Sequence, residues 1–330
     1  AIVRNALSDA GDDLTGSGWT EDAAAAIGDW AERIGLPVSL SFRRKDILSN
    51  ARPNYAGDLG LGCNPKLTAR AKAADLILAI GARLGENPTQ GYTLFDRART
   101  ADTLIHIHPG AEELGRVWTP LISATADNSL AAHALSAIDP GRTWHDEAAA
   151  AHADYVAFST PVPVTGAVNM SECMAHLHDS LPPTAIVTNG AGNFAAWLHR
   201  FYRHRACRTQ LAPTSGAMGY GYPAALAAKS VHPDREVICI AGDGDYLMTG
   251  QEIATAVQYG INAVVVVVDN GTYGTIRMHQ EMHYPGAQRT MATDLVNPDF
   301  VKYAEAFGAF GIRCETTADF PAALAAARAA

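Results

Sequence analysis

The sequence has 330 residues, of which 48% are hydrophobic and 18% are charged, and its formal net charge is −9 at pH 7. This length predicts two domains rather than one hydrophobic core, and the composition excludes an intrinsically disordered chain. The negative charge disfavours unaided electrostatic binding to nucleic acids or to anionic membranes.

The cysteine pattern and the first residues bear on the cellular compartment. The five cysteines are scattered and none lies in a CxxC pair, so neither a disulfide framework nor a zinc knuckle is indicated. No apolar run approaches the roughly 20 residues of a membrane-spanning helix, and the opening residues lack the basic and apolar regions of a signal peptide. These features predict a cytoplasmic protein. The abrupt start suggests a piece of a longer chain.

The first domain is expected at residues 1–139. A helix is predicted over residues 20–34, where apolar residues recur at helical spacing, with Thr20 as the N-cap and Gly35 just past the end. Strands alternating with helices imply a parallel sheet with helices on both faces. The strands expected in this domain are short apolar runs of the buried type, at residues 37–42, 76–80 and 103–107.

Residues 140–168 contain a polar helix and then an extended segment with prolines, which is typical of a linker. The alternation resumes in a second domain, residues 169–330. Five consecutive valines, Val264–Val268, indicate a central strand that is buried on both faces. The predicted fold class is therefore α/β, with two doubly wound, mostly parallel, Rossmann-like domains joined by a linker.

Polar residues follow two neighbouring strands of the second domain. Asp243, flanked by Gly242 and Gly244, comes directly after the apolar run at residues 236–241, at the carboxyl end where open α/β sheets bind ligands. Asn270 follows the valine strand in the same way. Because both loops leave the same edge of a parallel sheet, we expect the Asp243 carboxylate and the Asn270 amide oxygen to lie close together.

The helix between these two loops also has sequence signals at both ends. Thr249 and Glu252 have the spacing of a capping box, and Gly260 is expected to end the helix. These signals predict a regular helix that begins just beyond the acidic turn.

This arrangement predicts a Mg²⁺ site. Flanking glycines let the backbone approach an anionic ligand, but a carboxylate in such a site would repel the anion unless a cation lay between them. Mg²⁺ prefers about six oxygen ligands, commonly a carboxylate, neutral oxygens, water and substrate phosphates. An Asp, an Asn, a backbone carbonyl, two diphosphate oxygens and a water meet that requirement.

Two other interpretations of the glycine turn were weighed. A lone GDG is equally compatible with a strand-to-helix turn whose Asp caps its own backbone, and the second turn at Asn270 is what favours a metal. A Rossmann dinucleotide site is disfavoured, because GDGDYL lacks the third glycine and has two acids where a pyrophosphate would lie.

The motifs resemble those of the thiamine-diphosphate enzyme superfamily, and in particular acetolactate-synthase-like chains. In that superfamily a GDG turn is followed by an Asn-containing turn. Further matches in the second domain are PTSGAMGYGYPAALAAK at residues 213–229, TNGAGNFAAW at 188–197 and NPDFVKYAEAFGAFGIR at 297–313. In the first domain SFRRKDILSN, NYAGDLGLG and IGARLGE occur in the order of the family's middle domain.

The resemblance implies thiamine diphosphate and Mg²⁺ as cofactors. Asp243 and Asn270 would bind the metal through their side chains and Thr272 through its main-chain carbonyl. Met218 would support the bent cofactor, and the Gly216 carbonyl would accept a hydrogen bond from its 4′-amino group. The other cofactor contacts that the resemblance implies are Gly192, Asn193, Gly242, Gly244, Asp245, Tyr273 and Gly274.

The resemblance further implies a decarboxylase or carboligase of 2-oxo acids that works as a homodimer or homotetramer. The family's N-terminal pyrimidine-binding domain, which supplies the glutamate that activates the cofactor, has no counterpart in this sequence. No catalytic residue is therefore assigned, and the full-length chain or a partner would have to provide that domain. The alternative is a truncated or split subunit that binds cofactor without turnover. The opening residues also lack the family's hydrophobic first strand, which predicts an irregular edge of the first domain.

Two pairs of histidines have open interpretations. His106 and His108 would share one face of a strand, and they fit either a metal pair or a polar strand end beside a cleft. His279 and His283 lie four residues apart, and they fit either a substrate channel or a solvated helix face.

The basic run at residues 43–45 is also ambiguous. It fits a solvated loop end or a site for an anionic cofactor such as FAD. Arg83, which follows a strand and a glycine, has the same two interpretations. Nothing else in the sequence supports FAD.

Overall fold

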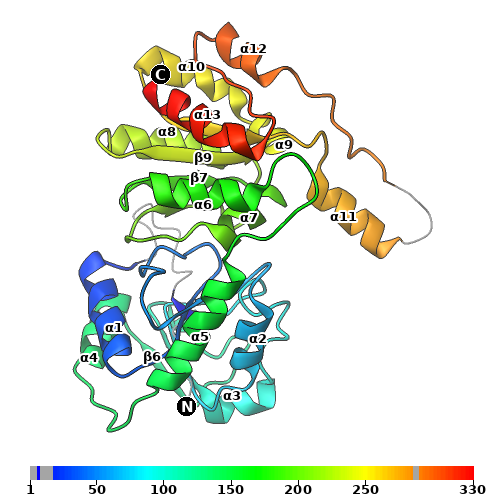
Figure 1. Ribbon diagram of the computed structural model, residues 1–330. Coiled ribbons are helices and arrows are strands. Elements are labelled where there is room, and N and C mark those ends of the chain that lie inside the picture. Colours follow the sequence, from blue (N-terminus) through cyan, green and yellow to red (C-terminus); the bar gives the residue numbers. More distant parts are fainter. Residues whose placement is uncertain (1–5, 8–17, 285–289) are drawn as a thin grey trace. The chain divides into compact units, whose positions relative to one another are not determined.

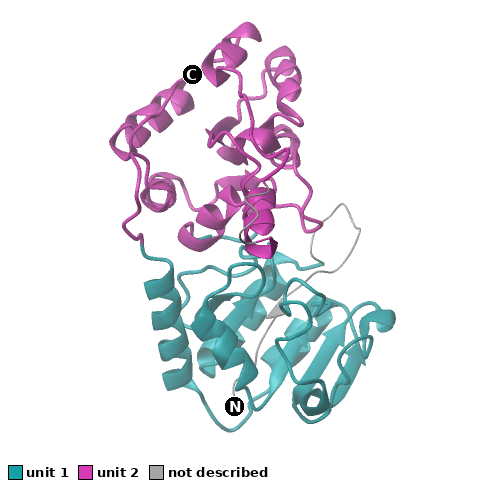
Figure 2. Ribbon diagram, turned by 90° about the vertical axis from the view of Figure 1, so that its right-hand side faces the viewer, with its two compact units in different colours: residues 1–160, 203–208 teal, residues 161–202, 209–330 magenta. Residues whose placement is uncertain are grey.

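The computed structural model describes residues 6–7, 18–284 and 290–330, and the chain divides into two compact units (Figures 1 and 2). Unit 1 comprises residues 1–160 and 203–208, and unit 2 comprises residues 161–202 and 209–330. Each unit contains a parallel sheet, as the α/β prediction requires. Within the described residues, no helix combines the length and apolarity needed to cross a bilayer.

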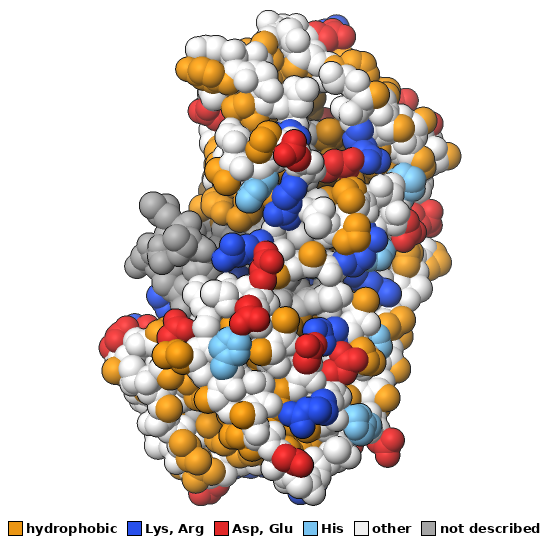
Figure 3. All heavy atoms as spheres, turned by 90° about the vertical axis from the view of Figure 1, so that its left-hand side faces the viewer, with side chains coloured by type: hydrophobic (Ala, Val, Ile, Leu, Met, Phe, Trp, Pro, Cys, Tyr) orange, Lys and Arg blue, Asp and Glu red, His pale blue; other side chains and the backbone are white. Residues whose placement is uncertain are grey.

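The described surface carries charges of both signs. On the face drawn in Figure 3, basic and acidic side chains are interspersed within each unit. Elsewhere among the described residues, charges of opposite sign pair directly, as in Arg277 with Glu281 and in Arg116 with the largely buried Glu113. The face drawn shows no broad basic patch.

The sheet of unit 1 has the strand order β3-β2-β1-β4-β5-β6, with every pairing parallel. This is the order of a doubly wound Rossmann fold. The strands are β1 (Ala6–Leu7), β2 (Val38–Leu40), β3 (Tyr55–Asp58), β4 (Ile77–Ile80), β5 (Leu104–His108) and β6 (Ile122–Thr125).

The position of β1 corrects one expectation. The opening residues do contain a strand, because β1 lies in the middle of the sheet, between β2 and β4, so the expectation that the first strand is lacking is wrong. The expected irregularity around it falls on residues 1–5 and 8–17, which lie outside the described residues. Ala6 pairs with Ser39 and Ala79, and Leu7 continues both ladders. The backbone groups of the buried strands β2 and β4 that face each other need hydrogen-bonding partners. The two residues of β1 provide partners to both strands, although β1 has only modest hydrophobicity.

Helix α1 (Glu21–Arg33) begins and ends as predicted. The Thr20 hydroxyl accepts a hydrogen bond from the Ala23 N–H at 3.1 Å, and Gly35 follows the helix with a φ of 70°. The helix packs against α4 (Asn128–Ser136) over one hydrophobic core of the unit. The other helical segments of unit 1 are α2 (Pro65–Lys72), α3 (Arg97–Thr103), the 3-10 turn η1 (Ala111–Glu113) and α5 (His145–Phe158).

Helix α5 lies in the segment that was predicted as a linker, and it is an integral part of unit 1. The Tyr155 ring packs edge-on against Tyr55 of β3, with centroids 4.7 Å apart, and Asp154 pairs with Lys66 and Arg70 of α2. The chain passes from unit 1 to unit 2 only after residue 160. The buried residues of α5 are Ala148, Ala151 and Tyr155. They form a narrow stripe that does not stand out in an alanine-rich sequence.

Arg43 and Lys45 of the basic run at residues 43–45 are buried and Arg44 is half-buried, which disfavours the solvated-loop interpretation. The Lys45 ammonium lies 3.6 Å from the Asp58 carboxylate. Burial lowers the pKa of Lys45 and raises the pKa of Asp58. Arg83, by contrast, is exposed and lies 3.8 Å from Glu113. These contacts are internal to the protein and give FAD no support.

The sheet of unit 2 has the order β10-β9-β7-β8, again with parallel pairings. Helices α6, α7 and α13 cover one face of it, and α8, α10 and α12 cover the other (Figure 1). The strands are β7 (Ile186–Asn189), β8 (Gln210–Leu211), β9 (Val237–Gly242) and β10 (Val264–Val268). The helices are α6 (Met170–Ser180), α7 (Phe194–Phe201), α8 (Gly221–Val231), α9 (Asp243–Tyr246), α10 (Ile253–Tyr259), α11 (Gly274–His283), α12 (Phe300–Ala306) and α13 (Phe320–Ala329), with 3-10 turns η2 (Gly250–Glu252) and η3 (Thr317–Asp319).

The valine strand β10 corrects a second expectation. It lies at the edge of the described sheet, and its five valines are half-buried rather than fully buried. Alternate valines do pack toward the two cores of the unit, which accounts for the unbroken apolar run. The strand is nevertheless paired on one side only, because residues 309–315 form no strand beside it.

The start of α10 corrects a third expectation. The Thr249 hydroxyl donates to the Gly219 carbonyl at 2.8 Å, and the Glu252 carboxylate accepts from Thr255, so the predicted capping box is absent. Thr249 precedes the 3-10 turn η2 rather than α10 itself, and its side chain caps neither. Gly260 ends the helix as predicted, with a φ of 62°.

His106 and His108 on β5 are both buried, and their rings lie 6.1 Å apart. His106 Nε2 is 2.7 Å from the Ala82 carbonyl, which can only accept, so Nε2 carries the proton. Within the described chain no group of three or more His, Cys, Asp or Glu residues could hold a metal ion. The pair therefore fits a buried polar strand end better than a metal site.

The burial of His106 predicts a pH-dependent stability. Burial lowers the pKa of His106 below its ordinary value of 6.5, so the unfolded chain takes up a proton that the folded chain does not. The contribution of the neutral His106 to the free energy of unfolding is fully present above pH 6.5. It is lost as the pH falls toward the folded-state pKa, so the free energy of unfolding decreases by up to about 1.4 kcal/mol per pH unit. We expect His106→Gln, which keeps a donor for Ala82, to flatten this dependence in urea unfolding between pH 7.5 and 5.5.

The half-exposed His133 provides the control for this measurement. His133→Gln should leave the dependence of the unfolding free energy on pH close to that of the unmodified chain. Equal slopes for the unmodified chain and His106→Gln would contradict the prediction.

Candidate metal centre

The candidate site lies in unit 2, at the carboxyl ends of three neighbouring strands. β7 leads into the loop at residues 190–193, β9 into Asp243, and β10 into the loop at residues 269–274. Because the order is β10-β9-β7, the acidic turn after β9 lies between the other two loops. The topology thus brings the predicted metal and diphosphate loops to one edge of one sheet.

Asp243 is the central residue of this edge. Its side chain is 3% exposed, and its two carboxylate oxygens have different partners. Oδ1 accepts a hydrogen bond from the Gly244 N–H at 2.8 Å. Oδ2 accepts one from the Gly271 N–H at 2.8 Å and one from the Asn297 amide at 2.7 Å. The acidic turn and the Asn270 turn are therefore joined by a direct hydrogen bond.

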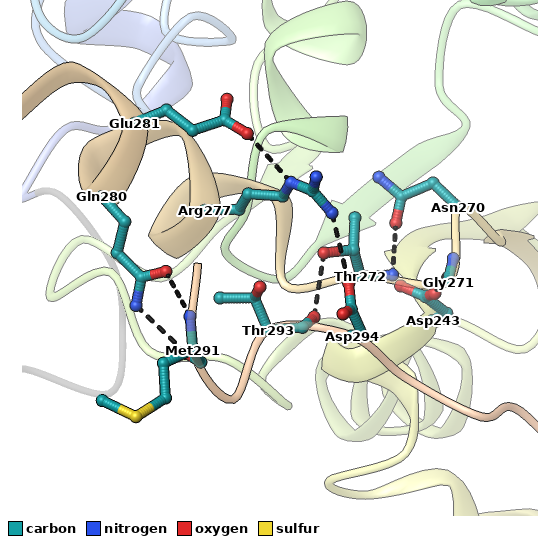
Figure 4. A network of polar contacts seen from close by, with 10 residues as sticks. All are labelled: Asp243, Asn270, Gly271, Thr272, Arg277, Gln280, Glu281, Met291, Thr293 and Asp294. Carbon is teal, nitrogen blue, oxygen red and sulfur yellow. Dashed lines mark hydrogen bonds and ion pairs between the residues drawn. The ribbon is translucent and has the colours of Figure 1, made fainter. Parts of the chain in front are cut away.

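The loop after β10 is folded by its own backbone (Figure 4). The Asn270 amide oxygen accepts from the Thr272 N–H at 3.2 Å, and the Thr272 carbonyl accepts from the Gly274 N–H at 2.8 Å. A Cβ added at Gly274 would lie 3.4 Å from the Asn270 side chain and 3.9 Å from that of Asn193. Asn193, Asn270 and Gly274 are thus neighbours in space.

Residues 293–297 cross this loop as an antiparallel strap. The Leu295 N–H donates to the Gly271 carbonyl at 2.8 Å, and the Thr272 hydroxyl donates to the Thr293 carbonyl at 2.9 Å. At the end of the strap, the Asn297 amide donates to Asp269 as well as to Asp243, at 2.7 Å in each case. Neither Asn297, the first residue of the NPDF motif, nor Asp269 was predicted from the sequence to have a role in the site.

Three of the predicted cofactor contacts are glycines that this chain itself needs. A Cβ at Gly192 or Gly242 would lie within 2.9 Å of the Phe194 ring, and one at Gly244 would lie 2.4 Å from the Tyr273 ring. Bulkier residues at these positions would displace two aromatic side chains. Close packing within the site therefore explains these glycines without any ligand.

Gly216 and Met218 lie in the loop before α8. Gly216 is exposed with a φ of 76°, and Met218 is half-buried. This loop is tied to the acidic turn through Gly219, whose N–H donates to Asp245 Oδ1 at 2.8 Å. The two predicted contacts with the aminopyrimidine thus lie on a loop that is anchored to the candidate metal loop.

Asp245 has a different environment from the one expected of a cofactor ligand. It is buried, and its Oδ1 accepts from the Ala191 N–H at 3.2 Å as well as from Gly219. A Cβ at Gly190 would lie 2.0 Å from the same oxygen. Asp245 therefore holds the loops after β7 and before α8 against the acidic turn.

The oxygen atoms available here suit a hard divalent cation. The predicted ligands are one carboxylate oxygen of Asp243, the amide oxygen of Asn270 and the main-chain carbonyl of Thr272. Asp243 Oδ1, Asn270 Oδ1 and the Thr272 carbonyl each accept one backbone hydrogen bond and keep lone-pair capacity for a metal. One anionic and two neutral oxygens, completed by phosphate oxygens and water, match the preference of Mg²⁺.

His279 and His283 lie on α11 and stack with their rings 5.8 Å apart. Both side chains are exposed, and α11 has no buried residue. Within the described chain this supports the interpretation as a solvated helix face.

The anchoring role of Asp245 leads to a prediction about stability. Asp245→Ala would leave the buried N–H groups of Gly219 and Ala191 without their acceptor, at a cost of about 1–3 kcal/mol in unfolding free energy. Asp245→Asn keeps an acceptor oxygen and should lose less. Urea denaturation of the three proteins would test this, and an Ala variant as stable as the unmodified chain would refute the anchoring role.

Comparisons with known proteins identify the family of the chain. Residues 14–135 match the family model for the central domain of thiamine pyrophosphate enzymes, and residues 190–330 match the model for their C-terminal TPP binding domain.

Similar proteins include an acetolactate synthase large subunit of Parasynechococcus marenigrum, which is 31% identical over 292 residues, covering 86% of this chain and 46% of the relative. An acetolactate synthase of Mycobacterium bovis is 29% identical over 324 residues, covering 93% and 51%. A probable acetolactate synthase large subunit of Methanocaldococcus jannaschii is 29% identical over 294 residues, covering 84% and 48%. The chain spans about half the length of these curated relatives. It belongs to the thiamine pyrophosphate enzyme family, of which it carries the central domain and the C-terminal cofactor-binding domain.

Proposed function

We propose that this chain binds thiamine diphosphate through Mg²⁺ in unit 2, as part of an acetolactate-synthase-like enzyme that decarboxylates or joins 2-oxo acids. The observation that carries the proposal is the buried Asp243 carboxylate at the tip of β9, hydrogen-bonded to the turn that presents Asn270 and Thr272. A buried carboxylate beside two neutral oxygens is a poor site for a bare anion and a good site for a cation that an anion then completes.

The residues of the chain would divide the work of binding. Asp243, Asn270 and the Thr272 carbonyl would hold the metal, and the loop at residues 190–193 would contact the diphosphate. Met218 would support the bent cofactor, and the Gly216 carbonyl would fix its amino group. Thiamine diphosphate supplies the carbanion chemistry when bound, while the protein contributes position, shape and electrostatics.

The activity of the whole protein is part of the proposal. The relatives named above are about twice as long as this chain, and their names describe them as acetolactate synthases. We infer a 2-oxo acid such as pyruvate as substrate and a homodimer or homotetramer as the assembly, in the cytoplasm. The alternative is a polypeptide that binds cofactor without turnover. Release of CO₂ from pyruvate by the purified chain with Mg²⁺ and thiamine diphosphate alone would eliminate that alternative.

The metal site provides the direct test. Asp243→Ala removes the only charged ligand of the proposed site, so we expect calorimetry with thiamine diphosphate and Mg²⁺ to show at least a 100-fold loss of affinity. Removing Mg²⁺ with a chelator should weaken binding to the unmodified chain in the same way.

Asp234→Ala is the matched control, since it removes one exposed acid of unit 2 away from the strand tips. It should bind thiamine diphosphate like the unmodified chain. Unchanged affinity in Asp243→Ala, or binding that is indifferent to Mg²⁺, would count against the proposed site.

A further inference from the structure

One amide group connects the two acidic residues at the strand tips. Asn297 Nδ2 donates to Asp243 Oδ2 and to Asp269 Oδ1, at 2.7 Å in both cases. Both N–H bonds of the amide are thereby used, one on each carboxylate. Two negative charges from the ends of β9 and β10 thus share neutral donors: the Asn297 amide and the Gly271 N–H, which is 2.8 Å from Asp243 Oδ2 and 3.2 Å from Asp269 Oδ1.

The orientation of this amide is fixed by electrostatics. A flipped side chain would point its oxygen at two carboxylates, so only the observed orientation is favourable. In this orientation Asn297 Oδ1 is buried and has no hydrogen-bond partner among the described residues. An unpaired buried oxygen costs about 1–3 kcal/mol, so the chain tolerates a penalty in order to keep the donor on the acids.

The strap places this amide from the opposite side of the loop. Residues 293–297 are hydrogen-bonded to the turn at residues 271–273. Two residues before the strap, both main-chain polar groups of Met291 are hydrogen-bonded to the Gln280 side chain (Figure 4). Asn297 is therefore carried by a segment that is itself built onto the proposed metal loop.

The two oxygens of Asp243 are left in unequal states. Oδ2 already accepts from Asn297 and from the Gly271 N–H, whereas Oδ1 accepts only from the adjacent Gly244 N–H. A carboxylate oxygen with two donors has little capacity left, and one with a single donor can still bind a cation. The hydrogen bonds thus leave Oδ1 as the carboxylate oxygen that is available to bind a cation.

We propose that Asn297 is a positioning residue of the metal site: its amide occupies Asp243 Oδ2, offsets the repulsion between Asp243 and Asp269, and directs Asp243 Oδ1 toward the cation. This inference rests on the proposed function of the site. Partners that orient metal ligands in this way typically contribute 10- to 100-fold in metal affinity, although they never touch the metal.

Two variants separate donation from packing. Asn297→Ala removes the amide, and Asn297→Asp keeps the shape of the side chain but replaces the donor with an acceptor. The affinity for Mg²⁺ would be measured by calorimetry on the full 330-residue chain at saturating thiamine diphosphate. We expect both variants to lose about 10- to 100-fold in Mg²⁺ affinity, with Asp at least as impaired as Ala.

Gln280→Ala is the matched control, because it removes the hydrogen bonds that hold Met291, just before the strap, without touching either acid. It should keep the Mg²⁺ affinity of the unmodified chain, and thermal melts without metal would check that all variants fold. The positioning role would be overturned if Asn297→Asp or Asn297→Ala kept the Mg²⁺ affinity of the unmodified chain, or if Gln280→Ala lost as much Mg²⁺ affinity as the Asn297 variants. Either result would leave the proposed function standing. Failure of the unmodified chain to bind thiamine diphosphate with Mg²⁺ would instead overturn the proposed function, and the inference with it.

Discussion

The organisation of unit 2 depends on one buried carboxylate. Asp243 lies at the tip of β9 with 3% of its surface exposed, and a charge in such a position needs compensation. The described residues supply hydrogen bonds from Gly244, Gly271 and Asn297, all of them neutral donors. These bonds tie the loop after β10 and the strap at residues 293–297 to the acidic turn. The geometry of the site therefore follows from the hydrogen bonds that one buried carboxylate requires.

The second acid of the turn, two residues further on, has another task. Asp245 accepts hydrogen bonds from the N–H groups of Ala191 and Gly219. Residues 243 and 245 thus connect the acidic turn to different neighbours, one toward β10 and the other toward β7 and α8. The glycines of these loops allow the close approach, since a Cβ at Gly190 or Gly244 would collide with Asp245 or Tyr273. The motif therefore has a structural role, the joining of four loops, beside the ligand-binding role that we propose for it.

The sequence predicted those features that depend on local signals. The N-cap at Thr20, the helix end at Gly260 and the meeting of the two turns were all available from residue type and spacing. The central place of β1, the edge position of β10 and the use of Thr249 as a tether to Gly219 were not, because each is decided by residues distant in the chain. Asn297 was missed for the same reason: it lies 54 residues beyond Asp243, and only the folded strap brings them together.

The charges around the site explain why a metal, rather than a basic side chain, would attract a diphosphate there. The chain has a net charge of −9, and two acids end the neighbouring strands β9 and β10. The basic residue of this network, Arg277, is already paired with Glu281 at 3.1 Å and with Asp294 at 3.2 Å (Figure 4). The positive charge of Arg277 is therefore neutralised by acidic residues of α11 and of the strap. A divalent cation between the acids and the phosphates would change the local electrostatic potential from negative to positive. Anion binding at this edge should therefore require the metal.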